Sequence, residues 1–81
     1  MIKEENVAVK VDKALHEAYR LLEESIRNVN ENCSATESED YRHRVGKVFY
    51  AMIFDLWEPL YKEHPNLKPA DWDGDTISGT D

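Results

Sequence analysis

Residues 41–61 read YRHRVGKVFYAMIFDLWEPLY, and this stretch decides the fold. Apolar side chains recur in it every three or four residues, which is the period of an amphipathic helix. One stripe of this helix consists of Tyr41, Val45, Val48, Met52 and Leu56, with Phe49 and Leu60 beside it. A stripe of this width predicts that the helix packs against another helix of the same chain.

A second stripe lies on the other side of the same predicted helix. It consists of Tyr50, Phe54, Trp57 and Tyr61, which we call the aromatic stripe. A helix that is apolar on two faces must be covered twice, whereas one helix of the same chain covers only one face. Two copies of the chain could cover each other by pairing through these stripes with two-fold symmetry. We therefore expect a homodimer whose interface is the aromatic stripe, with His43 and Lys47 at its polar end.

An alternative cover for the aromatic stripe stays open. The C-terminal segment could fold back and place Trp72 on Trp57 or Phe54, which would bury the stripe within one chain. That outcome would remove this argument for a dimer.

The partner helix of the hairpin is expected upstream, at about residues 6–30. Its apolar stripe consists of Val11, Leu15, Ala18, Leu22, Ile26 and Val29, with Ser25 beside Ile26. The start of this helix stays open between Asn6 and Asp12. Val7, Val9 and Val11 alternate as a strand would, and Asp12 is a good N-cap residue.

The connection and the second helix follow from local signals. Overlapping capping-box patterns beginning at Ser34 and Thr36 predict a helix over about residues 35–63. Pro59 lacks a backbone donor, so we expect a kink or break there. The sequence thus predicts an all-α antiparallel two-helix hairpin over residues 1–64, paired as a dimeric four-helix bundle. An irregular acidic arm is expected over residues 65–81.

The small size and acidic charge of the chain indicate which kinds of partner it has. The 81-residue, 9.4 kDa chain has a formal net charge of −7. A domain this small buries only about 60% of its unfolded surface, and the single Cys33 cannot form an internal disulfide, so a partner is expected. The acidic balance argues against nucleic acid. No signal-peptide pattern is visible, and the apolar run from Val48 to Phe54 is far shorter than the ~20 residues that span a bilayer. We expect a cytoplasmic protein without a membrane partner.

The residue patterns that could indicate a catalytic or metal site are all incomplete in this sequence. Asp40 and His43 have the acid-x-x-His spacing of di-iron bundles, but those sites need a second such motif and further inward carboxylates. The run from Asp71 to Asp75 resembles a calcium loop and fails its spacing, because glycine is fourth and no glutamate occupies the twelfth position. The basic residues Arg42, His43, Arg44 and Lys47 are expected to neutralise the acids one turn earlier. We predict no catalytic residue, no metal site and no cofactor.

These features favour a non-enzymatic helical protein that acts through self-association or adaptor-type contacts. One alternative is an acidic binding protein for a heterologous protein partner, in the manner of an inhibitor, an immunity protein or an antitoxin. A third hypothesis is a bundle that binds a metal or a small ligand.

Overall fold

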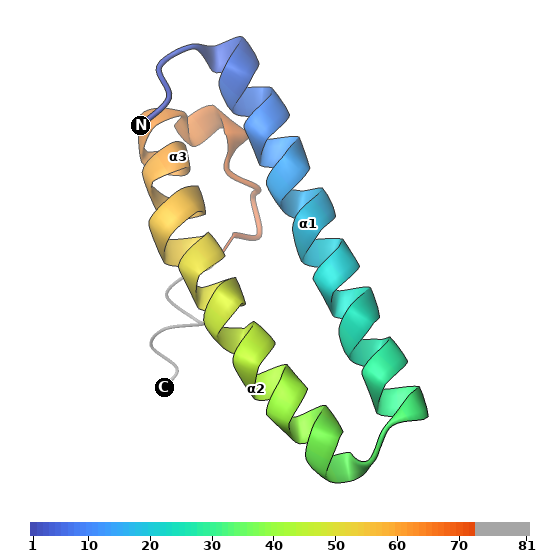
Figure 1. The fold of residues 1–81 in the computed structure, drawn as a ribbon. Helices are drawn as coiled ribbons and strands as arrows, with labels where there is room; N and C mark the ends of the chain where they lie inside the picture. The colour runs from blue at the N-terminus through green and yellow to red at the C-terminus, as the bar shows by residue number, and fades with distance from the viewer. Residues whose placement is uncertain (73–81) are drawn as a thin grey trace.

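The computed structural model describes residues 1–72, and two long helices form an antiparallel hairpin in it (Figure 1). Its elements are α1 (Glu5–Asn32), α2 (Ala35–Ala51), the π-helix η1 (Met52–Trp57), α3 (Glu58–Glu63) and the 3₁₀-helix η2 (Pro65–Leu67). The described residues contain no strand, so the predicted all-α hairpin is confirmed. None of the described helices has the length and apolar character needed to cross a membrane.

The turn between the two long helices is short and strongly capped. Only Cys33 and Ser34 separate α1 from α2. The Glu37 N–H donates to Ser34 Oγ at 3.1 Å, and the Ser34 N–H donates to Glu37 Oε1 at 3.0 Å. This reciprocal capping box satisfies two N–H groups that would otherwise lack partners, which explains why α2 begins here. The backbone and hydroxyl donors of Ser34 also lower the pKa of Glu37.

The predicted disturbance at Pro59 takes the form of a widened turn that precedes it. Pro59 has no N–H, and its ring crowds the carbonyl of Asp55 four residues earlier. In η1 the hydrogen bonds reach one residue further back, as in the bond from the Glu58 N–H to the Ile53 carbonyl. The chain remains helical from α2 through η1 into α3, so Pro59 neither breaks the helix nor ends it.

The π-helix changes which side chains face α1. Its extra residue shifts the phase of the following side chains by about 100°. In an unbroken α-helix Leu56 would follow Met52 toward α1, yet Leu56 is 37% exposed. Trp57 and Tyr61 turn inward instead and are only 2% and 4% exposed. The expectation that the whole aromatic stripe lies on an outer face is therefore wrong for these two residues.

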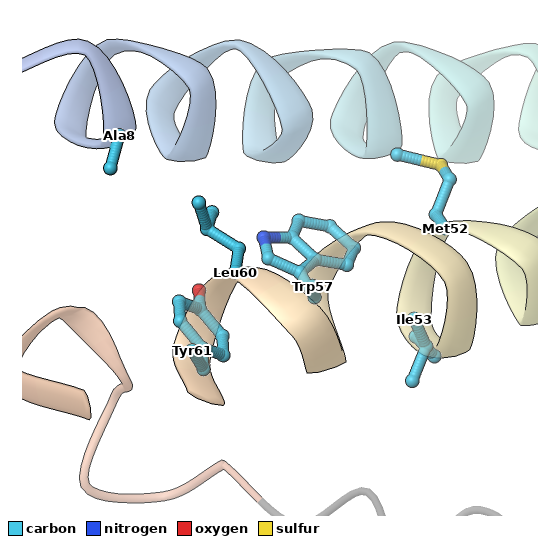
Figure 2. Close-up of a cluster of buried hydrophobic side chains, with 6 residues drawn as sticks. All are labelled: Ala8, Met52, Ile53, Trp57, Leu60 and Tyr61. Carbon is cyan, nitrogen blue, oxygen red and sulfur yellow. The ribbon is translucent and has the colours of Figure 1, made fainter. Parts of the chain in front are cut away.

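The core is concentrated at the end of the hairpin that carries the chain's N-terminus. Its buried apolar residues are Ala8, Met52, Ile53, Trp57, Leu60 and Tyr61 (Figure 2). In Figure 2 the side chains of Met52 and Leu60 point toward α1. Leu60, which α3 contributes, is fully buried. This core holds α3 and η1 against the first turns of α1.

Polar contacts close the same end of the hairpin. The buried His64 lies 2.6 Å from the Ile2 carbonyl, and a carbonyl can only accept, so His64 Nε2 carries a proton and donates it. The Met1 ammonium pairs with Glu63 at 2.7 Å and lowers the pKa of that carboxyl group. The chain then turns back through η2 and reaches Trp72. The irregular acidic arm was predicted over residues 65–81, and its first residues form η2. Residues 73–81, which hold the calcium-like run except for Asp71 and Trp72, lie outside the described residues.

Candidate functional site

A polar cluster joins α1 to the residues that the π-helix turns inward. Asp12 Oδ1 accepts a hydrogen bond from Trp57 Nε1–H at 3.1 Å and another from the Tyr61 hydroxyl at 2.5 Å. The Asp12 side chain is 19% exposed, so these bonds form largely away from water. Two aromatic donors thus converge on one carboxylate oxygen. The cluster fixes the register of α1 against η1 and α3.

His16 completes this cluster from the next turn of α1. Its Nε2 lies 3.3 Å from the Tyr61 oxygen and 3.4 Å from Asp12 Oδ1. Because Tyr61 gives its proton to Asp12, its oxygen accepts, and the proton therefore resides on His16 Nε2. The imidazole also lies against the Trp57 indole, with ring centroids 4.9 Å apart. The donors of the cluster are all used within the fold, which is the arrangement of a structural network.

The environment of the Tyr61 hydroxyl predicts how the stability of the fold changes at high pH. Burial, with the nearby Asp12 carboxylate, raises its pKa above the ordinary value of 10.0. A raised pKa in the folded state means that the neutral phenol contributes stability below the ordinary value, and this contribution is lost as pH rises toward the folded-state pKa. We expect a late step in the tyrosinate absorbance titration, above the ordinary range, that coincides with loss of helical circular dichroism. Burial and the nearby Glu23 also raise the pKa of Tyr19, so Tyr61→Phe should make the late step smaller. An unchanged late step in this variant would contradict the assignment.

One side of the groove between the two long helices is covered by the chain itself. Trp72 packs edge-on against Trp57 and Tyr61, with ring centroids 5.8 and 5.1 Å away. On the same side Tyr19 of α1 stacks on Phe49 of α2 at 4.0 Å. We call this the covered side. The internal cover that the sequence left open is therefore present, and the aromatic stripe no longer argues for a dimer.

A small hollow remains beside Trp72 on the covered side. It has a volume of about 160 Å³ and is lined by His16, Tyr19, Ile53, Trp57 and Trp72. At roughly 30 Å³ of liquid volume per water molecule, it has room for a few waters. Among residues 1–72 no three histidine, cysteine or carboxylate side chains gather in a way that could hold a metal ion.

The remaining predicted interface residues lie together on another surface. They are His43, Lys47 and Tyr50 of α2 and Phe54 of η1, which follow one another at spacings of four, three and four on the face that points away from α1. We call them the outer ridge. Tyr50 is 51% exposed and stacks on the half-buried Phe54 at 5.3 Å. The six predicted residues are thus divided between this ridge and the core.

A surface that the sequence reasoning missed lies opposite the covered side. Val7, Ala14 and Leu21 each precede a residue that faces α2, so they are rotated about 100° away from it on α1. Val7 and Leu21 are 48% and 50% exposed. The spacing of seven residues, with Val11 and Ala18 between, was the signal that could have revealed a second seam on this helix.

The second helical arm contributes to the same surface. Ser25 lies one turn beyond Leu21, and its Oγ is 2.7 Å from the Tyr41 hydroxyl of α2. This contact identifies the side of α2 that adjoins the exposed residues of α1. Val48, seven residues after Tyr41, is 46% exposed there, and Leu56 follows it. We define the open face as Val7, Val11, Ala14, Ala18, Leu21, Val48 and Leu56.

Comparisons with protein-family models, with curated proteins and with solved structures found no match to this chain.

Proposed function

We propose that this protein is a non-enzymatic interaction module that self-associates through the open face to form a dimeric four-helix bundle. The observation that carries the proposal is the difference between the two sides of the hairpin. Tyr19, Phe49 and Trp72 fill one side, whereas the opposite side presents half-exposed Val7, Leu21 and Val48 to solvent. Contiguous apolar surface of this kind is characteristic of interaction sites.

The arrangement of α1 supports a second helical neighbour. Ala8, Leu15 and Leu22 face α2, and the line of Val7, Ala14 and Leu21 is offset from them by one residue, or about 100°. Each helix of a four-helix bundle contacts two neighbours on adjacent faces. α1 therefore has two apolar seams at the angle that a bundle requires, and among residues 1–72 only one of them has a partner.

The charge distribution favours a second copy as the occupant. Ion pairs hold the charged residues that border the open face on α1. Arg20 bonds Glu17 at 2.7 Å and Glu24 at 2.5 Å, and both glutamates lie one helical turn from Leu21. At the α2 rim, Arg44 pairs with Asp40 at 3.0 Å. The open face is defined by its apolar residues, and these charged residues at its border are paired within each chain. Two copies can therefore meet there without opposing like charges.

Sedimentation equilibrium tests the proposal with matched variants. We expect the wild type to form a dimer and Leu21→Glu to weaken it by at least about tenfold, which is about 1.4 kcal/mol. Val7→Glu should also weaken it. Val9→Glu is the control, because Val9 belongs to the same helix and is 40% exposed but lies outside the open face. Helical circular dichroism should be retained in all three variants.

Two results would contradict this proposal. The first is a wild type that stays monomeric at high micromolar concentration. The second is a dimer that Val9→Glu weakens as much as Val7→Glu does, since this would place the contact elsewhere on α1.

A further inference from the structure

Gly46 lies in the interior of α2, where glycine costs about 1 kcal/mol relative to alanine. Close approach of another helix would explain a glycine at such a position. However, a Cβ atom built on Gly46 meets no other atom within 4 Å. No packing contact among residues 1–72 therefore requires glycine here.

The surface around Gly46 is a shallow hollow beside the outer ridge. It has a volume of about 370 Å³ and is lined by Arg42, His43, Gly46, Lys47 and Tyr50. Tyr50 offers the exposed part of its ring at one end of the hollow. The missing Cβ lowers the floor of the hollow, so a polypeptide backbone could approach the helix more closely at Gly46 than at neighbouring positions.

The cations around this hollow lack partners within the described part of the chain. Sequence reasoning expected them to neutralise nearby acids, and this holds for Arg44, which pairs with Asp40. Glu37 is engaged by the Ser34 cap. Among residues 1–72, no carboxylate lies within ion-pair distance of Arg42, His43 or Lys47.

From these observations we propose that the hollow at Gly46 is a docking site for an acidic polypeptide segment of another protein. The partner's backbone approaches Gly46, its carboxylates pair with Arg42 and Lys47, and an apolar side chain packs on Tyr50. Because the chain is otherwise acidic, this local positive patch would also fix the orientation of an acidic partner.

Charge argues against a second copy of the chain in this hollow. A two-fold contact centred on Gly46 would bring Arg42 and Lys47 of one copy close to the same two residues of the other. Like charges held together at an interface are destabilising. The hollow also shares no residue with the open face, so either proposal can fail without the other.

Gly46→Ala separates binding from folding. Since alanine is the better helix former and its methyl group meets no atom, we expect the Tm to rise by about 4–8 °C. The probe is a synthetic helical peptide of about 20 residues with glutamates on one face and alanine and leucine on the other. In fluorescence anisotropy at low ionic strength, wild type should bind it with a Kd below about 100 µM, and Gly46→Ala should weaken binding at least about tenfold.

Charge variants provide the matched control. Lys47→Glu and Lys13→Glu change the net charge equally, but Lys13 lies on the exposed side of α1. We expect Lys47→Glu to weaken binding of the peptide at least about tenfold and Lys13→Glu to change it less than about threefold. The same peptide with glutamine in place of glutamate should not bind.

Any of four results would overturn the docking proposal. They are no saturable binding of the glutamate peptide by wild type, equal affinities of wild type and Gly46→Ala, equal effects of the two lysine reversals, and equal binding of the glutamine peptide. A dimer that Gly46→Ala dissociates would assign the hollow to a second copy and would also overturn it.

Discussion

Trp57→Ala is expected to lower the free energy of unfolding by about 3–5 kcal/mol, as large truncations in a packed core do. Trp57 is 2% exposed, donates to Asp12 and supports the Trp72 ring. The variant therefore leaves a cavity and removes a polar partner in the same position. Urea denaturation followed by far-ultraviolet circular dichroism measures the change.

Tyr50→Ala is the control for this experiment, because Tyr50 belongs to the same aromatic stripe in the sequence but is half-exposed in the structure. Its substitution should change the free energy of unfolding by no more than about 0.5 kcal/mol. Similar losses in the two variants would mean that the two residues share one environment, which would contradict the rotation at the π-helix.

Asp12→Ala has the second largest expected effect. It would leave the Trp57 N–H and the Tyr61 hydroxyl without their acceptor, at a cost of about 1–3 kcal/mol for each buried donor. We expect a total loss of about 2–4 kcal/mol in the free energy of unfolding. Asp12→Asn keeps a carbonyl oxygen in the same place, so it should retain more than half of that stability. Equal unfolding midpoints for the alanine and asparagine variants would show that the acceptor is not needed.

The helices were predictable from the sequence because their signals are local. The period of the apolar residues identified both long arms, and the capping box at Ser34 and Glu37 marked the start of α2. These features depend on residues within one or two turns of each other. A single sequence contains them in full.

The direction of the side chains after Met52 was not predictable in the same way. Apolar residues occupy both possible phases of the helix, with Leu56 in one and Trp57 and Tyr61 in the other. Periodicity cannot choose between them. The second phase buries two large aromatic rings and gives both a partner on Asp12, which lies 45 residues before Trp57. Pro59 indicated that a disturbance would occur nearby, but not that it would be a π-turn.

The location of the candidate interface depends on which side chains the π-helix turns toward α1. Once Trp57 and Tyr61 turn inward and Trp72 packs on them, the uncovered apolar surface moves from α2 to the side shared by α1 and α2. Its residues were visible in the sequence. Their exposure depends on which side the C-terminal segment covers, and that is a tertiary contact between residues far apart in the chain.

An isotope-filtered NOE experiment on an equimolar mixture of labelled and unlabelled protein tests the open-face dimer most directly. We predict intermolecular NOEs from the methyl groups of Val7, Leu21 and Val48. Intermolecular NOEs that arise only from Tyr50 and Phe54, or none at all at high micromolar concentration, would contradict the proposed dimer.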